Sequence, residues 1–172
     1  MENPVRFFTA TILKWQHLLK PDKYKQVVVD SMKFLVDDNR LWIYGFVLMP
    51  AHIHLLWRMN NGHEEKSVQR DFLKLTDQTI KADLSANDPK VLDYFKSTQK
   101  NRQYQFWERR PYSSTMYSRL VVEQKLDYMH NNPVLPHWKL AEEPGGYDFT
   151  SARHYLLNER QWDFITHYTK HI

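Results

Sequence analysis

The 172-residue chain contains no cysteine and only four glycines. Without cysteine there are no disulfides, thiolate metal sites or cysteine nucleophiles. So few glycines argue against a glycine-rich phosphate loop and against an all-β fold built on glycine turns. No apolar run approaches the roughly 18 residues needed to cross a bilayer, and the N-terminus lacks the pattern of a signal peptide. We therefore expect a cytoplasmic protein with no membrane association.

The residues that are present favour one globular domain. Hydrophobic residues make up 42% of the chain and aromatic residues 15%, which is enough to build a core. Lysine and arginine number 24 against 20 acidic residues, a formal net charge of +4. That mild excess permits a polyanionic partner but does not require one. We predict a single domain over residues 1–172, with a C-terminal helical extension from about residue 137.

Short strands and amphipathic helices alternate along the chain. We predict strands at 7–13, 41–49, 52–58 and 103–107, and helices at about 21–37, 64–84, 118–132 and 152–158. Residues 85–99 form a loop or a short helix. The two middle strands, joined at Met49–Pro50–Ala51, read as a β-hairpin. This order predicts an α+β fold, an antiparallel sheet with helices packed on one face.

The first candidate site is the pair His52 and His54. Alternate residues of a strand point to the same side, so both imidazoles emerge together, about 6.6 Å apart along the chain. Ile53, Leu55 and Trp57 then share the other face and can pack on helices, which leaves the histidine face without a helical cover. Paired neutral imidazoles suit a first-row metal ion. Taken alone, however, two histidines on a strand are more often inert than metal-binding.

The second candidate site is Tyr128 with Asn132, four residues apart on a predicted helix and therefore on one face. His130 points away and is not counted as a partner. Pro133 biases the backbone of Asn132 out of the helical region, and its side chain could equally be a plain cap. Taken alone, Tyr128 is more often a surface aromatic than a nucleophile.

The two sites make chemical sense together. A tyrosine hydroxyl is a poor nucleophile at neutral pH, and it needs a polarised electrophile. A divalent cation held by His52, His54 and the amide oxygen of Asn132 would polarise a phosphate for attack by Tyr128. A hard oxygen ligand beside two histidines favours Mg²⁺ or Mn²⁺.

Two runs of the sequence resemble motifs of a known family. The run YGFVLMPAHIHLLW is similar to the HUH motif (His, bulky hydrophobe, His) of single-tyrosine transposases, and KLDYMHNNPV is similar to their tyrosine helix. The nearest resemblance is to the REP-associated tyrosine transposases, and it extends to FFTATILKW, DFLKLTDQTIK, FWERRPYS and YDFTSARHY. Two departures are Ala51, where relatives often have Asn, and Thr150–Ser151, where many have Ser-Ser.

The resemblance implies a ferredoxin-like, RRM-like core of the HUH endonuclease type. It implies metal-dependent nicking and joining of single-stranded DNA through a 5′-phosphotyrosine, at palindromic repeats that fold into REP-like hairpins. Carried over by position, Tyr128 is the nucleophile, and His52, His54 and Asn132 are the metal ligands. It further implies a bacterial, cytoplasmic and nucleoid-associated protein, more often a monomer than a homodimer.

Candidate DNA contacts follow from basic residues near aromatic ones, because phosphates meet cations and bases stack on rings. The candidates are Lys74, Lys81, Arg109, Arg110, Arg119 and Arg153. For each of them a solvated surface charge is an equal alternative.

Two other functions fit the same residues. One is a catalytically silent protein that binds hairpin DNA. The other is a metal-dependent hydrolase in which a bound water, rather than Tyr128, attacks a different substrate.

Overall fold

The computed structural model describes residues 2–172. Its strands and helices, in chain order, are β1 (Val5–Thr11), α1 (Asp22–Asp37), β2 (Leu41–Leu48), β3 (His52–Met59), α2 (Glu65–Asn87), α3 (Pro89–Asp93), β4 (Tyr112–Thr115), α4 (Arg119–Asn131) and α5 (Ala152–Leu156). Short 3₁₀ turns lie at 13–15, 132–134, 144–146 and 168–170.

The four strands form one antiparallel sheet in the order β2-β3-β1-β4. The predicted hairpin is present as β2 and β3, and β1 lies beside β3. In this register His54 pairs with Thr9 of β1 on one side and with Val47 of β2 on the other. The α+β fold with an antiparallel sheet is therefore confirmed, and the histidine strand is central in it.

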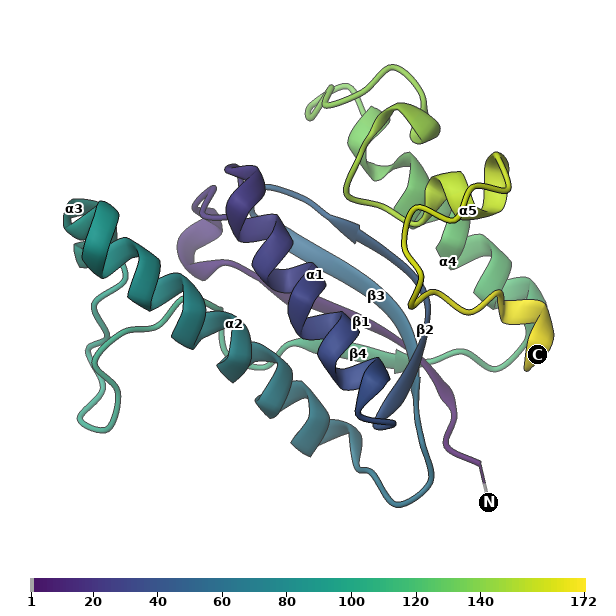
Figure 1. The fold of residues 1–172 in the computed structure, drawn as a ribbon, viewed down its shortest axis with the longest axis horizontal. Helices are drawn as coiled ribbons and strands as arrows, with labels where there is room; N and C mark the ends of the chain where they lie inside the picture. Colours follow the sequence, from purple (N-terminus) through teal and green to yellow (C-terminus); the bar gives the residue numbers. More distant parts are fainter. Residues whose placement is uncertain (1) are drawn as a thin grey trace.

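The two faces of the sheet are both covered (Figure 1). Helices α1 and α2 pack on the face that carries Ile53, Leu55 and Trp57, as predicted. Helix α4 lies on the opposite face, where Val122, Leu126 and Met129 join a second hydrophobic cluster. The prediction that the histidine face lacks a helical cover was wrong. The apolar stripe of α4 docks there, and helices occupy both faces.

The fourth strand was predicted in the wrong place. Residues 103–107 make only isolated bridges, Lys96 to Tyr104 and Ile12 to Trp107, while the strand that pairs with β1 is Tyr112–Thr115. The aromatic residues that suggested a strand are buried instead: Phe106 and Trp107 are both buried, and the Phe106 ring lies 5.2 Å from the Phe95 ring. β4 has the sequence YSST, whose hydroxyl side chains give no apolar alternation to detect.

The segment after residue 137 is less helical than predicted. Among the described residues it holds the five-residue α5 and two 3₁₀ turns, and it contacts the outer edge of β2 at residues 149–151 and 165–166. The backbone N–H of Leu48 donates to the carbonyl of Phe149, and that of Thr166 donates to the carbonyl of Ile43. This segment completes the sheet edge and holds α4 against the sheet.

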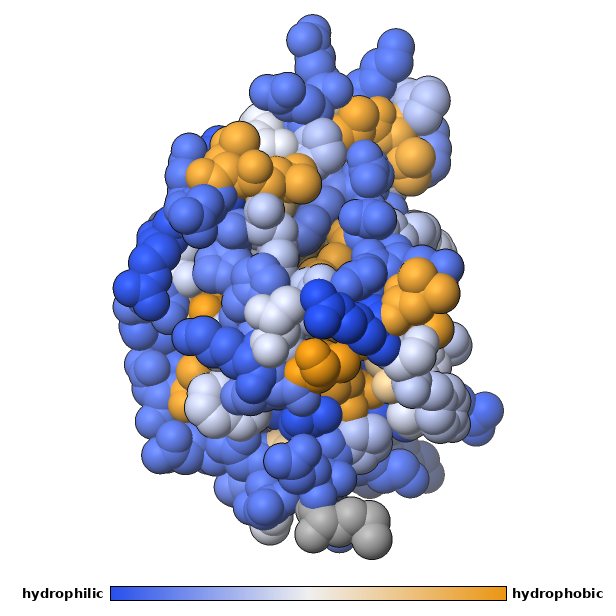
Figure 2. Space-filling view, turned by 90° about the vertical axis from the view of Figure 1, so that its right-hand side faces the viewer, coloured by the Kyte–Doolittle hydropathy of each residue, from blue (hydrophilic) through white to orange (hydrophobic). Residues whose placement is uncertain are grey.

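The side of the molecule that carries α4 and the C-terminal segment is largely hydrophilic, with hydrophobic side chains in separate spots (Figure 2). Within residues 2–172 no helix combines the length and the apolar character that a membrane crossing requires.

Candidate functional site

The structure brings His52, His54, Tyr128 and Asn132 into one pocket. The pocket has a volume of about 460 Å³, and its lining residues are Thr9, Thr11, Trp15, His52, His54, Tyr128, Asn132, Leu135, His137 and Trp138. The contributing elements are β1, β3, α4 and the turns after β1 and after α4. Residues more than 70 positions apart in the sequence therefore share one cavity.

The two histidines lie side by side on β3, with ring centroids 4.8 Å apart. Both are buried, with 6% of His52 and 5% of His54 exposed. Burial lowers the pKa of His52, and it lowers the pKa of His54 to about 3, with further lowering by His52 and Lys125. Both imidazoles are therefore neutral at physiological pH, which is the state that binds metal ions.

Thr9 orients His54 from the neighbouring strand. Its hydroxyl oxygen lies 2.7 Å from Nδ1 of His54. When the Nδ1–H donates to this hydroxyl, Nε2 keeps its lone pair free. The Nε2 atom of His54 is buried and has no hydrogen-bond partner. A partner on the second ring nitrogen is the usual arrangement for a metal-binding histidine.

Asn132 meets His52 at the end of α4. The side-chain oxygen of Asn132 lies 3.1 Å from Nε2 of His52. Contrary to the sequence-based expectation, Asn132 has helical backbone angles, φ −54° and ψ −47°. It opens a 3₁₀ turn with Pro133, so the helical path continues for one more residue and keeps Asn132 on the face that carries Tyr128.

Tyr128 stands at the mouth of the pocket with 49% of its surface exposed. Its ring lies 5.4 Å from that of His54 and 6.2 Å, edge-on, from that of Phe7. Lys125, one turn earlier on α4, places its ammonium 5.5 Å from the Tyr128 ring centroid and 4.8 Å from that of Phe7. The tyrosine is thus accessible to a large substrate and has a cation beside it.

His130 is outside the pocket, as expected. It is buried, its Nε2 lies 2.8 Å from the hydroxyl of Ser151, and burial lowers its pKa to about 4. The Ser151 hydroxyl also accepts a hydrogen bond from the backbone N–H of Phe46 in β2. These contacts hold α4 against the sheet and so help to position Tyr128 relative to His54.

The donor atoms fit a divalent cation. No group of three or more His, Cys, Asp or Glu side chains in residues 2–172 is arranged to hold a metal ion. A cation held by the two histidines would therefore take the amide oxygen of Asn132 as a third ligand. Ligands at about 2.1 Å that bind at right angles stand ~3.0 Å apart. The 3.1 Å between Nε2 of His52 and the Asn132 oxygen matches that spacing.

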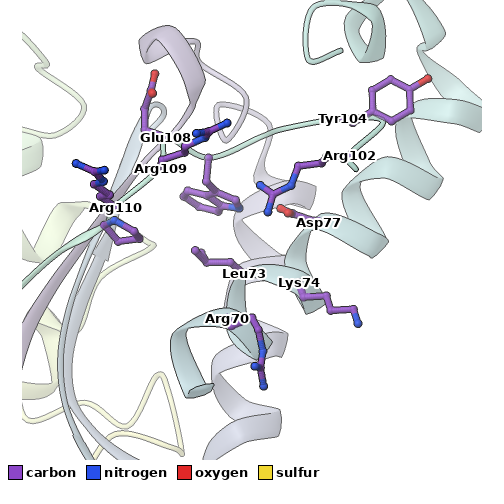
Figure 3. Close-up of a pocket in the computed structure, with 11 residues that line it drawn as sticks. Arg70, Leu73, Lys74, Asp77, Arg102, Tyr104, Glu108, Arg109 and Arg110 are labelled. Carbon is purple, nitrogen blue, oxygen red and sulfur yellow. The ribbon is translucent and has the colours of Figure 1, made fainter. Parts of the chain in front are cut away.

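Three of the predicted DNA contacts line a second cavity, of about 470 Å³ (Figure 3). Lys74 comes from α2, and Arg109 and Arg110 come from the segment before β4. Arg70 and Arg102, which were not among the predicted DNA contacts, line the same cavity. Five cationic side chains thus gather around one hollow, with Tyr104 and Trp107 among its other walls.

The other three predicted contacts lie outside the lining of that cavity. Lys81 stands over the Tyr104 ring, with its ammonium 5.3 Å from the centroid. Arg119 pairs with Glu123 at 2.9 Å on α4. Arg153 donates to the carbonyl of Gly145 at 2.8 Å and pairs with Asp148 at 2.9 Å. Two of its guanidinium nitrogens, Nε and Nη2, therefore have partners within the chain.

No family model matches the chain, and no curated protein matches its sequence. Among solved structures, one of a REP-associated tyrosine transposase bound to a REP hairpin superposes with a TM-score of 0.67. That comparison covers 94% of this chain and 84% of the other, at 18% identity. The chain has the fold of a REP-associated tyrosine transposase. This is the fold that the sequence resemblance predicted.

A second structure, of a candidate transposase from Deinococcus radiodurans, has a TM-score of 0.49 and 17% identity. The comparison covers 76% of this chain and 92% of that one.

Residues in and beside the pocket that were not predicted include Thr9, Trp15 and Trp138 of its lining and Lys125 next to Tyr128. Thr9 was missed because it reaches His54 only through the β1–β3 register, and Trp15 and Trp138 because they lie on turns. Lys125 carried a detectable signal, since it precedes Tyr128 by three positions on the same helix.

Proposed function

We propose that this protein is a metal-dependent nuclease and strand-transfer enzyme of the HUH single-tyrosine type, which acts on single-stranded DNA beside REP-like hairpins. The observation that supports it most directly is the joint placement of Tyr128 and the His52–Asn132 contact in one pocket. The fold shared with the hairpin-bound transposase supports it further.

In the proposed reaction, the hydroxyl oxygen of Tyr128 attacks the phosphorus of a DNA phosphodiester. A bond forms between the tyrosine oxygen and phosphorus, and the bond from phosphorus to the 3′ oxygen breaks. The Tyr128 hydroxyl gives up its proton to solvent and the 3′ oxygen takes one up from solvent, so the strand leaves with a 3′-hydroxyl and the 5′ phosphate stays on the enzyme. Attack by a second 3′-hydroxyl reverses these bonds and joins two strands without an external energy source.

His52, His54 and Asn132 would hold Mg²⁺ or Mn²⁺. The bound cation would withdraw charge from a non-bridging phosphate oxygen. Thr9 orients His54 for this role. Lys125 lies close enough to Tyr128 to contact the same phosphate and to offset the charge that develops on it.

All proposed ligands and the nucleophile belong to one chain and meet in one pocket. A second copy is not needed to complete the site, so we propose a monomer that acts in cis. The basic cavity with Lys74, Arg109 and Arg110 would bind the DNA backbone through phosphate contacts.

A covalent-adduct assay tests this function. A labelled single-stranded oligonucleotide with a REP-like hairpin is incubated with Mn²⁺, and adducts are resolved on a denaturing gel. We expect an adduct with the wild-type protein and a loss of about 10³-fold or more with Tyr128→Phe. The matched control is Tyr117→Phe, at a tyrosine that is 89% exposed and outside the pocket lining.

Other outcomes separate the alternatives. Cleavage that persists in Tyr128→Phe would assign the attack to water and make the protein a hydrolase. Tight binding with no cleavage across several metals and hairpins would make it a silent DNA-binding protein.

A further inference from the structure

Two tryptophans flank His52 at the mouth of the pocket. The ring centroid of Trp15 lies 5.7 Å from that of His52, and the ring centroid of Trp138 lies at the same distance. Trp15 follows β1 and Trp138 follows α4, so two turns more than 120 positions apart bring indoles to one imidazole. Both indoles line the pocket.

Each tryptophan lies on a turn with left-handed backbone at residues other than glycine. Lys14 and Trp15 have φ of 54° and 56°, and Lys139, next to Trp138, has φ of 45°. Such angles are unfavourable for residues with a Cβ and persist only where the surroundings enforce them. Two strained turns at one pocket indicate that the positions of the indoles matter for what the pocket does.

Hydrogen bonds hold the first turn in place. The backbone N–H of Lys14 donates to the carboxylate of Glu108 at 2.7 Å, and that of Leu13 donates to the carbonyl of Phe106 at 2.8 Å. In the second turn the N–H groups of Trp138 and Lys139 both donate to the carbonyl of Leu135 at 2.9 Å. Hydrogen bonds within the chain therefore hold the backbone of both turns that carry the indoles.

Packing does not account for Trp15. Its side chain is 60% exposed, although an indole is among the most apolar surfaces available to a protein. Trp138 is half-buried and also packs near His17. An exposed indole on a hydrogen-bonded turn beside a proposed phosphate site is an arrangement that proteins use to stack bases of single-stranded nucleic acid.

We propose that Trp15 and Trp138 form a stacking site for an unpaired nucleobase next to the phosphate that Tyr128 attacks. This rests on the proposed function and adds how the substrate is recognised. A base inside a duplex has both faces covered by its neighbours, whereas an unpaired base presents them to the indoles. The site would select single-stranded DNA and tolerate any base, because every base has an aromatic face.

Glu108 is the positioning residue for this site. Its carboxylate accepts the Lys14 N–H that fixes the turn before Trp15, and it belongs to the segment that also supplies Arg109 and Arg110. The stacking site and the basic cavity are thus joined through one residue. A strand that leaves the pocket past Trp15 would next meet the arginines of the cavity.

Equilibrium binding of two ten-nucleotide probes tests the proposal. One probe is fluorescein-labelled dT10, and the other is an abasic decamer with the same phosphates and no bases. Binding is measured by fluorescence anisotropy at low salt, with every variant made in a Tyr128→Phe background to prevent covalent trapping. We expect Trp15→Ala to weaken dT10 binding by about tenfold and to leave abasic binding unchanged, and Trp15→Phe to retain most of the affinity.

Two matched comparisons control for indirect effects. Trp42→Ala removes another exposed indole, on β2 opposite Arg58 and so at the far end of β3 from His52, and should leave both probes unaffected. Glu108→Ala should weaken dT10 binding, whereas Glu108→Gln, which keeps an acceptor for the Lys14 N–H, should restore it.

The outcomes distinguish this proposal from the proposed function. Unchanged dT10 binding by Trp15→Ala would overturn the stacking site alone, as would equal losses for dT10 and the abasic probe. Failure of the Tyr128→Phe protein, with no further substitution, to bind either probe would overturn DNA processing, and the stacking site with it.

Discussion

Both faces of the sheet are covered by helices, but they differ in the side chains that they bury. Under α1 and α2 the sheet contributes hydrophobic side chains such as Phe8, Leu55 and Trp57. Under α4 it contributes hydrophobic residues together with His52 and His54, which lie beside Asn132. Buried polar groups cost stability unless they are satisfied, and Nε2 of His54 has no partner. The face under α1 and α2 buries mainly hydrophobic side chains, whereas the face under α4 also buries two histidines, one of which has a ring nitrogen without a partner.

The largest effect should come from the face under α1 and α2. Trp57→Ala removes a fully buried indole that stacks on Phe8 at 4.8 Å. We expect the free energy of unfolding to fall by about 3–5 kcal/mol, measured by urea denaturation. Trp42→Ala, at a 40% exposed tryptophan, should cost far less. Equal losses for the two variants would contradict the assignment of this face as the stabilising one.

A second change tests how closely α4 must sit on its face. A Cβ added at Gly45 of β2 would lie 2.5 Å from a methyl carbon of Leu126 and 3.1 Å from the terminal methyl of Met129. We expect Gly45→Ala to cost about 1–3 kcal/mol. Because these two residues bracket Tyr128, adduct formation should also slow under conditions where the variant is fully folded.

Gly146→Ala is the control for that change, since the nearest atoms to its new Cβ lie at 3.7 Å. Normal adduct formation by a folded Gly45→Ala variant would show that the position of α4 is not critical.

Asp77 is a carboxyl on α2, on the stabilising side. Burial raises its pKa to about 7, although Trp107 and Arg102 act to lower it. The folded state then binds more protons than the unfolded state between about pH 4 and 7, so the contribution of Asp77 to stability falls as pH rises through that window. We expect the free energy of unfolding of Asp77→Asn, relative to that of the wild type, to rise by on the order of 1–2 kcal/mol from pH 5 to pH 8.

Urea denaturation of both proteins at pH 5 and at pH 8 measures this gain. Comparing the two free energies of unfolding at each pH removes the contribution of the histidines, which both proteins contain. A constant gap between the two proteins would contradict the raised pKa.

The smallest effect on stability should come from the histidine face. His54→Leu replaces a buried polar ring by an apolar side chain, and we expect less than about 1 kcal/mol of change without metal. Mn²⁺ at a hundredfold excess over its Kd should stabilise the wild type by about 2.7 kcal/mol and the variant hardly at all. A thermal melt with and without Mn²⁺ measures both quantities. An equal Mn²⁺ shift in the two proteins would remove His54 from the metal site.

The sequence predicted those parts of the fold and the candidate site that depend on local periodicity. The β2–β3 hairpin, helix α2 and the shared face of His52 and His54 follow from spacings of two and 3.6 residues. Placing β4 failed because YSST has no apolar alternation, while the aromatic run before it is buried without forming a strand. The prediction of an uncovered histidine face was wrong because the docking of α4 is a tertiary contact, which local periodicity does not indicate.

Contacts between distant segments were beyond prediction for the same reason. Nothing near Thr9 in the sequence indicates that it will face His54, since that pairing depends on strand register over 45 positions. Trp15 and Trp138 likewise depend on where two turns end. The chemistry of the candidate site could be inferred from the sequence, because the histidine pair and the tyrosine helix indicate a function when they are considered together.

The path of the C-terminal segment along β2 has a consequence for solubility. An unprotected edge strand offers free N–H and carbonyl groups to other chains, and it is a common origin of aggregation. β2 has the sequence LWIYGFVL, and seven of its eight residues are buried. Residues 149–166 hydrogen-bond to its outer edge through Phe149, Ser151 and Thr166. Proteolysis before residue 149 would expose that edge, so the segment also protects the protein from self-association.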